Sequence, residues 1–405
     1  MKEKRHLEKR GHSPVCFIDI DEKKHGSEFL GLPVFSFEDA QKLYSEFMIH
    51  VTLVSDQRYH AQENLVSRGF DRSRIVNYVS VEEHDGCELL EFKLLYDHDG
   101  MFPCCREDEV YMNEPPRVKW TGEDIESSVL EYIDMRSRIV SQLKEGEASE
   151  CTGCKFVKRD LFSTESKLKS LVFGFDAPCQ LSCKYCMHRN ASRTDQGNEI
   201  DKFMSVFPIN RFIRCLEEQK MLDYNTVVSF FGGELSINPR KNELLDAVKD
   251  YEIDVATNAV LFDSMIASVA TSLNASVDAG TRRTYKDIKG SNSFEIVWGN
   301  LKKYSDSGVK TTAKYIFLEE NSNYEDVRGF LVETEKANVR NIAISTDVFC
   351  NSPYTDFRTS LIIDMIEGAS RSGINATLET PFFKPWDIEK IILAATSRGI
   401  KLCFA

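Results

Sequence analysis

Residues 174–190 read GFDAPCQLSCKYCMHRN, which places Cys179, Cys183 and Cys186 in one loop directly after an apolar run. The C-x3-C-x2-C spacing lets three thiolates hold three irons of a cubane cluster. The fourth iron is then left without a protein ligand and stays open to a small chelating molecule. Thiolates also bind zinc, but zinc modules usually pair one C-x2-C with a second one nearby, and no second pair lies downstream. The loop therefore favours an iron–sulfur cluster over zinc.

With Tyr185 directly before its last cysteine, the triplet resembles the hallmark of the radical S-adenosylmethionine (radical SAM) superfamily, and the resemblance extends to about residue 347. It implies a [4Fe-4S] cluster whose open iron takes the amino and carboxylate groups of S-adenosylmethionine. An electron delivered to the sulfonium then yields a 5′-deoxyadenosyl radical, which abstracts a hydrogen atom from the substrate. The resemblance also implies an electron donor such as a flavodoxin or a ferredoxin as a partner.

Composition and charge argue against several classes of function. The chain has 405 residues, enough for about two or three domains, and a formal net charge of -13. Basic residues form a run only in Lys2–Arg10, which argues against nucleic acid or an anionic membrane as a partner. The start has no apolar signal region, and no run of about 18 apolar residues occurs. We therefore expect a soluble, cytoplasmic protein.

The 12 cysteines gather mainly before and within the triplet. Because no signal peptide is visible, clustered thiols indicate metal ligands in a reducing compartment rather than disulfides. Four cysteines lie in apolar or helical settings and are expected to be small buried hydrophobes: Cys16, Cys215, Cys350 and Cys403.

Residues 1–83 are expected to form a Rossmann-like domain. Apolar runs at 15–20, 49–54 and 75–80 alternate with helical stretches, a pattern typical of a parallel α/β sheet. The stretch IDIDEKKHGSEFLGLPV resembles small nucleotide-binding-like domains of sugar-modifying proteins. No G-x-G-x-x-G turn precedes Val15, so either the natural start lies earlier or this domain binds no dinucleotide.

Residues 84–160 are expected to form a cysteine-rich module. Cys87, the neighbours Cys104 and Cys105, and the pair Cys151 and Cys154 resemble the SPASM or Twitch modules that hold an auxiliary [4Fe-4S] cluster. Those modules usually follow the radical domain, whereas this segment precedes it. Adjacent cysteines in an extended chain point apart, so one of the two neighbours is expected to bind, with the first favoured. A structural zinc on the same thiols is the alternative.

Residues 161–405 are expected to form an α/β domain, a partial (β/α)6-type radical SAM barrel. Apolar runs predict strands near 168–175, 226–231, 252–257, 273–278, 310–317, 339–346 and 375–380, with amphipathic helices between them. In such a barrel the chemistry lies at the carboxyl ends of the strands. The polar motifs of this region all follow predicted strands.

Gly232, Gly233 and Glu234 follow the second of these strands. The glycines let the backbone approach a ligand, and the carboxylate can receive an ammonium group. About 45 residues after the triplet, GGE matches the family's site for the amino group of S-adenosylmethionine, whereas alone it could be an ordinary turn. Asn258 ends the next strand, where the family often has a polar pair near the methionine portion; a helix-capping turn is the alternative.

The stretch ASVDAGTRRTYKDIKG resembles the family's segment for the ribose hydroxyls, with Ser276 favoured over Asp278 for direct contact. Lys314 lies in the otherwise apolar run TTAKYIFL and needs an anionic partner. The carboxylate of S-adenosylmethionine and an ion pair inside the barrel are equally good candidates for that partner. Ser345, Asp347 and Glu379 end later strands and could face the substrate.

Two substrate classes follow from these resemblances. The N-terminal resemblance favours a sugar or nucleotide-linked small molecule that undergoes dehydrogenation, epimerisation or elimination. The SPASM-like cysteines favour a peptide or protein side chain. A non-catalytic binding protein stapled by zinc or a cluster is the alternative to an enzyme.

Overall fold

The computed structural model describes residues 14–19, 22–29, 31–43, 49–50, 55–71, 74–76, 81–97, 100–103, 116–119, 124–154, 156–163, 167–174, 178–186, 207–347, 353–380 and 383–404. Within them the chain divides into two compact units. Residues 1–84 and 159–165 belong to the first unit, and residues 85–158 and 166–405 belong to the second. Each unit has its own apolar clusters.

The first unit contains short strands and two described helices. Its elements are β1 (Phe17–Ile18), η1 (Glu22–Lys24), β2 (Glu28–Phe29), β3 (Leu32–Phe35), α2 (Phe37–Leu43), β4 (Ile49–His50), α3 (Ser55–Ser67), β5 (Ile75–Val76), and most of β6 (Val81–Gly86) and β9 (Lys158–Ser163). β1 pairs in parallel with β3, and β4 in parallel with β5, as expected for an α/β unit. β2 pairs antiparallel with β3. The Rossmann-like assignment of this unit stays a prediction.

The second unit is built on a nine-stranded sheet of order β16-β15-β14-β13-β12-β11-β10-β7-β8. The strands are β7 (Lys93–Asp97), β8 (Gly100–Phe102), β10 (Ser170–Gly174), β11 (Val227–Phe231), β12 (Glu252–Thr257), β13 (Ser272–Ser276), β14 (Lys310–Phe317), β15 (Asn341–Thr346) and β16 (Asn375–Leu378). Neighbours pair in parallel from β7 and β10 to β16, and only β8 pairs antiparallel, with β7. β7 and β8 come from the segment that the sequence assigns to the cysteine-rich module.

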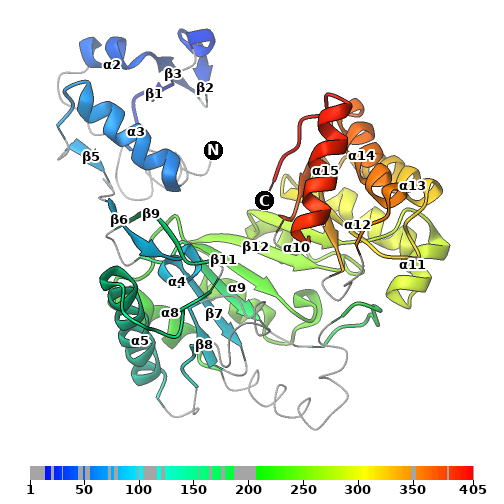
Figure 1. Ribbon diagram of the computed structural model, residues 1–405, viewed down its shortest axis with the longest axis horizontal. Coiled ribbons are helices and arrows are strands. Elements are labelled where there is room, and N and C mark those ends of the chain that lie inside the picture. Colours follow the sequence, from blue (N-terminus) through cyan, green and yellow to red (C-terminus); the bar gives the residue numbers. More distant parts are fainter. Residues whose placement is uncertain are drawn as a thin grey trace. The chain divides into compact units, whose positions relative to one another are not determined.

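Helices alternate with the strands of this sheet, as the sequence predicts (Figure 1). They are α4 (Glu88–Phe92), α5 (Ile125–Glu145), α8 (Ile209–Glu218), η4 (Leu235–Ile237), α9 (Lys241–Ala247), α10 (Ser264–Val269), α11 (Arg282–Lys289), α12 (Phe294–Asp306), α13 (Tyr324–Lys336), α14 (Asp356–Arg371) and α15 (Pro385–Ser397). The sequence did not predict α4, η4, α11 and α15. Strand–helix units of this kind, with an open parallel sheet, form the expected partial barrel.

The helices pack on one face of the sheet because the strands alternate apolar and polar side chains. In β12, Ile253 and Val255 are buried with helix residues, whereas Glu252 and Asp254 point to the other face and are half-buried. The same alternation in β13 leaves Ser272, Asn274 and Ser276 half-buried. The face opposite the helices is therefore rich in hydrogen-bonding groups.

Aromatic side chains join α8 to the strands on which it packs. The Tyr96 ring stacks on Phe207 at 4.4 Å and lies 5.0 Å from Phe212, and Phe173 stacks on Phe230 at 5.4 Å. Each buried aromatic ring contributes roughly 2–3 kcal/mol relative to an exposed one. This cluster fixes β7, β10 and β11 against α8, and β10 leads into the triplet loop.

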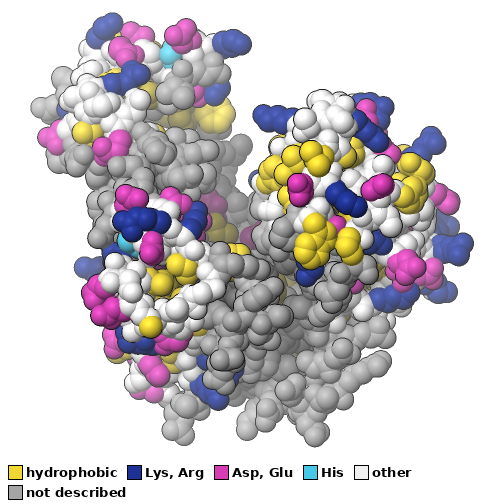
Figure 2. Space-filling view, viewed as in Figure 1, with side chains coloured by type: hydrophobic (Ala, Val, Ile, Leu, Met, Phe, Trp, Pro, Cys, Tyr) yellow, Lys and Arg dark blue, Asp and Glu magenta, His cyan; other side chains and the backbone are white. Residues whose placement is uncertain are grey.

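Charged side chains of both signs are interspersed over the described surface of the face drawn in Figure 2. Of the described helices, none combines the length and the apolarity that crossing a bilayer requires.

The turn after β13 packs so closely on α13 that it requires a glycine. A Cβ at Gly280 would lie 1.8 Å from the carbonyl oxygen of Asp326, and the Gly280 amide donates a 2.6 Å hydrogen bond to the Asp326 carboxylate. Gly329 completes the close approach, because a Cβ there would lie 2.3 Å from the Gly280 carbonyl oxygen. Gly280 thus fixes the segment between β13 and α11.

Replacement of this glycine should destabilise the protein. We expect Gly280→Ala to lower the free energy of unfolding by about 3 kcal/mol, because the methyl group forces the turn away from α13. Gly299→Ala is the matched control, since a Cβ there, within α12, meets nothing within 4 Å; it should stabilise by about 0.5–1 kcal/mol. Chemical denaturation of the full chain measures both. Equal stability of the two variants would contradict the packing described.

Candidate functional site

The triplet loop, residues 178–186, follows β10 at the carboxyl end of the parallel sheet. Cys179 is exposed, and Cys183 and Cys186 are partly buried. Desolvation raises the pKa of Cys179 and of Cys183, and the neighbouring thiols raise both further. A cation bound at this loop would favour the thiolate forms of these two cysteines.

The chemistry of the donor set fits an iron–sulfur cluster. Among the described residues, no group of three or more His, Cys, Asp or Glu side chains is arranged to hold a metal ion. Binding at this loop therefore requires the cysteine side chains to reorient toward a shared metal. Three thiols in one loop and a nearby amide donor to one sulfur, described below, are the features that fit such a group.

The loop is fixed by backbone hydrogen bonds to the end of α11. The amide of Ser182 donates to the carbonyl of Lys289 at 3.1 Å, and the amide of Lys184 donates to the carbonyl of Ile288 at 3.0 Å. Gly290 ends α11 with φ +69°, and a Cβ there would lie 2.2 Å from the Ser182 hydroxyl oxygen. The glycine is required both by its conformation and by the nearness of the loop.

Asp278 connects the loop to the sheet. It is fully buried with φ +57°, and one carboxylate oxygen accepts the amide of Ile316 at 2.8 Å. The other oxygen lies 2.5 Å from Nζ of Lys289 and accepts a hydrogen bond from the hydroxyl of Tyr185. Burial and the charge of Asp278 raise the pKa of Tyr185 well above its usual range, so the phenol remains a donor.

These contacts bear on the predicted ribose site. Both carboxylate oxygens of Asp278 already have protein partners, whereas Ser276 is half-buried on the inner face of β13. The Ser276 hydroxyl has no hydrogen-bond partner in the part of the chain that the structure describes. Its accessibility agrees with the preference for Ser276 over Asp278 as a direct contact, and both assignments stay predictions.

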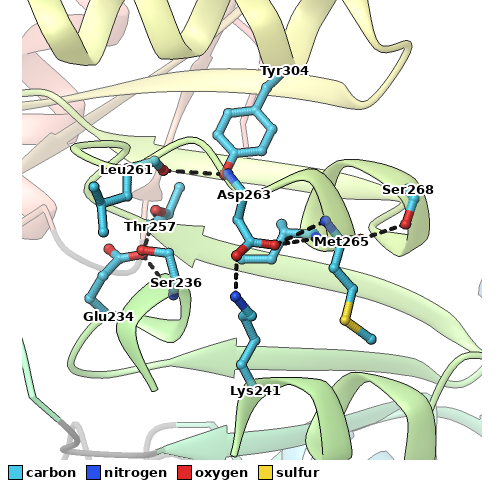
Figure 3. A network of polar contacts seen from close by, with 10 residues as sticks. Glu234, Ser236, Lys241, Thr257, Leu261, Asp263, Met265, Ser268 and Tyr304 are labelled. Atoms are coloured by element: carbon cyan, nitrogen blue, oxygen red, sulfur yellow. Dashed lines mark hydrogen bonds and ion pairs between the residues drawn. The ribbon is translucent and has the colours of Figure 1, made fainter. Parts of the chain in front are cut away.

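Glu234 organises the carboxyl ends of β11 and β12 (Figure 3). Its Oε1 accepts hydrogen bonds from the hydroxyls of Ser236 at 2.7 Å and Thr257 at 2.8 Å and from the Ser236 amide at 3.2 Å. Its Oε2 accepts the amide of Asn258 at 2.7 Å. Glu234 is only 1% exposed, and three of these four donors converge on Oε1 while one reaches Oε2. An incoming ammonium group would have to share oxygens that already hold the two turns together.

Asn258 links this network to the triplet loop. Its side-chain amide donates to Sγ of Cys179 at 3.5 Å, and its carbonyl oxygen accepts from the side chain of Gln180 at 3.2 Å. Amide donors to ligand sulfurs influence the reduction potential of iron–sulfur clusters. The predicted cofactor residue Asn258 therefore lies beside the predicted cluster residue Cys179.

Gly232 and Gly233 form the turn between β11 and Glu234. Their φ angles are +80° and +55°, a conformation that favours glycine. Gly232, Phe231 and Asn238 line a cavity of about 10 Å³, enough for about one water molecule. The turn can bring backbone groups close to a ligand, as the sequence predicts.

Lys314 has the intramolecular partner that the sequence left as one of two alternatives. Its Nζ lies 2.6 Å from Oε2 of Glu379, at ion-pair distance but without hydrogen-bond alignment. Lys314 is the register partner of Ser276 in the sheet, so its side chain belongs to the same face. To bind an external carboxylate, Lys314 must exchange this contact with Glu379.

Three of the cysteines expected in the auxiliary module lie together. Cys87 and Cys151 are buried in one apolar cluster, and the amide of Cys154 donates to the Cys151 carbonyl at 3.1 Å. Desolvation raises the pKa of Cys87 and raises that of Cys151 to about 12, and the nearby thiols add to both shifts. Cys104 and Cys105 lie outside the described residues, as does Cys350. Cys215 is buried as expected.

One expectation about a cysteine fails, and one buried residue of the site was missed. Cys403 was expected to be buried and is exposed, although Leu402 before it packs against the core. Lys289 was not singled out, because a lysine at a helix end before glycine usually faces solvent. The signal that could have found it is the close approach of residues 182–185, which appears only in three dimensions.

Comparison with known proteins identifies the family. Residues 178–331 match the Radical SAM superfamily. This part of the chain is a radical SAM domain. No curated protein matches the chain.

Several solved structures resemble the fold at low identity. SuiB from Streptococcus suis is 13% identical, with TM-score 0.39, and the match covers 81% of this chain and 71% of SuiB. The enzyme anSMEcpe with bound AdoMet is 12% identical, with TM-score 0.39, and the match covers 52% of this chain and 63% of that one. A domain of pyruvate-formate lyase-activating enzyme from Bacteroides vulgatus is 15% identical, with TM-score 0.30 and coverage of 37% and 97%. Since these scores are low, the family assignment rests on residues 178–331.

The Glu234 network predicts a stability effect that needs no cofactor. We expect Glu234→Ala to lower the free energy of unfolding of the metal-free protein by about 3 kcal/mol, because buried donors lose their acceptor. Ser276→Ala is the control and should change it by less than about 0.5 kcal/mol, since the hydroxyl holds no described residue. Thermal and chemical denaturation compare the two. An unchanged stability in Glu234→Ala would assign the carboxylate to ligand binding alone.

Proposed function

We propose that the chain is a radical SAM enzyme whose cluster is held by Cys179, Cys183 and Cys186. When bound, a [4Fe-4S] cluster with S-adenosylmethionine supplies a 5′-deoxyadenosyl radical that abstracts hydrogen from a substrate. One observation carries the proposal: within a radical SAM domain, the triplet loop is docked beside Asn258 and the GGE turn. An electron donor such as a flavodoxin or a ferredoxin, and a cytoplasmic location, belong to the same proposal.

The residues around the loop have distinct proposed roles. The turn of Gly232 and Gly233 approaches the amino group of S-adenosylmethionine, and Glu234 holds that turn while contributing negative charge. Ser276 binds a ribose hydroxyl, because its own hydroxyl is uncommitted among the described residues. Lys314 receives the carboxylate of S-adenosylmethionine after exchange from Glu379.

The proposed substrate is a sugar or nucleotide-linked small molecule that undergoes dehydrogenation, epimerisation or elimination. The stretch IDIDEKKHGSEFLGLPV supports this choice, because it resembles small nucleotide-binding-like domains of sugar-modifying proteins.

A peptide substrate is the second candidate. The three neighbouring thiols of Cys87, Cys151 and Cys154 favour it, because they resemble part of the auxiliary module frequent in peptide-modifying enzymes. Genes next to the coding sequence separate the two classes: glycosyltransferases support the small molecule, and a short precursor peptide supports the peptide.

Metal content and S-adenosylmethionine cleavage test the central proposal. Anaerobically reconstituted protein should contain about eight irons with matching sulfide, and a Cys179→Ala, Cys183→Ala, Cys186→Ala variant should lose about four of them. Dithionite-driven formation of 5′-deoxyadenosine should fall to background in that variant. Cys403→Ala, at an exposed cysteine, is the matched control and should retain both. A protein that binds only zinc, or a triplet variant with full iron content, would overturn the proposal.

The auxiliary centre is tested separately. Cys151→Ala with Cys154→Ala should remove the second centre, seen as a loss of about four irons or of zinc, because two neighbouring ligands are gone. Reductive cleavage of S-adenosylmethionine should persist, since the triplet is intact. Cys215→Ala removes another buried cysteine and should leave the metal content unchanged. Unchanged metal in the double variant would rule out an auxiliary site on this cysteine pair.

A further inference from the structure

A buried ion pair lies under the triplet loop. The side chains of Lys289 and Asp278 are 1% and 0% exposed, and their charged atoms are 2.5 Å apart. Taking two such charges out of water costs several kcal/mol per ion, and an apolar pair of the same volume often stabilises a fold equally well. The stability of the fold therefore does not by itself account for a charged pair at this position, beside the triplet loop.

Lys289 contacts the loop on both sides of Cys183. Its carbonyl accepts the amide of Ser182 at 3.1 Å, and its Nζ lies 2.5 Å from the hydroxyl of Tyr185. The ammonium group also lies 4.9 Å from the centre of the Tyr185 ring. The cation is thus held below the middle of the loop by the residues that flank the cysteine.

The charge of Lys289 lies beside the cysteine motif. Its ammonium group contacts the hydroxyl and the ring of Tyr185, which directly precedes Cys186. The carboxylate of Asp278 accepts a hydrogen bond from the same hydroxyl. Both charges are shielded from solvent, so salt and water screen them little.

The same two charges must act on a cluster bound to these thiols. Reduction adds one electron and makes a thiolate-bound cluster more negative, and nearby charge sets its potential. A fixed cation beside the cluster stabilises the reduced form, whereas a fixed carboxylate destabilises it. Lys289 and Asp278 therefore have opposite electrostatic effects although they share one hydrogen-bonded structure.

We propose that the charge of Lys289 raises the reduction potential of the cluster bound by Cys179, Cys183 and Cys186. The opposite charge of Asp278 lowers that potential and so partly offsets the effect of Lys289. This inference rests on the proposed cluster. It extends the function of the loop, because it assigns control of electron uptake to a residue outside the cysteine motif.

The test uses full-length reconstituted protein and redox titrations monitored by electron paramagnetic resonance. Lys289→Met should decrease the equilibrium constant for reduction about tenfold, which corresponds to 59 mV for one electron. Asp278→Asn should increase it, since the cation loses its counter-charge; asparagine tolerates the positive φ at this position. Lys289→Arg should stay close to wild type. Lys241→Met is the control, because it removes a different ion pair, with Asp263, which is partly buried.

The opposite signs distinguish an electrostatic role from a structural one. A loop that is merely loosened shifts both single variants in the same direction, and that result, or two unchanged potentials, would overturn the inference. If Lys289→Met does not fold, the double variant Lys289→Met with Asp278→Asn should lie below Asp278→Asn alone, and equal potentials would reject the role of Lys289. Thermal unfolding of the metal-free variants checks folding independently. A wild-type protein without any cluster would instead reject the proposed function, and this inference with it.

Discussion

The parallel pairing of β10 through β15 is the constraint on which the site depends. Because neighbouring strands run in one direction, their carboxyl ends meet at one edge, and the segments after β10, β11, β12 and β13 come together there. Residues far apart in sequence thereby touch: Cys179 meets Asn258, and Tyr185 meets Asp278. The chemistry inferred from the cysteine spacing has a place to occur only because of this pairing.

The polar residues at this edge divide into two groups. Asp278 and Glu234 are buried, accept several hydrogen bonds each and hold loops in position. Ser276 and Lys314 are half-buried on the sheet face opposite the helices and can meet a ligand. Burial and the number of protein partners thus separate the residues that build the site from those that can bind in it.

Sequence reasoning predicted the repeating architecture well, because strand and helix periods are local properties. β12 and β14 have the bounds expected from the apolar runs, and the radical SAM domain was recognised from the triplet and the GGE turn. The partners of single residues could not be predicted. The ion pair of Lys289 with Asp278 depends on how α11 meets the triplet loop, and α11 is an amphipathic helix of eight residues that the strongly polar sequence RRTYKDIK concealed.

The central claim is that three thiolates leave one iron of the cluster open to S-adenosylmethionine. Electron–nuclear double resonance on the reduced protein tests it most directly, with S-adenosylmethionine labelled by nitrogen-15 in the amino group and by oxygen-17 in the carboxylate. The account predicts hyperfine coupling of both labels to the cluster, and its loss in the triplet variant. A reduced cluster that shows no coupling to either label in the presence of saturating S-adenosylmethionine would contradict it.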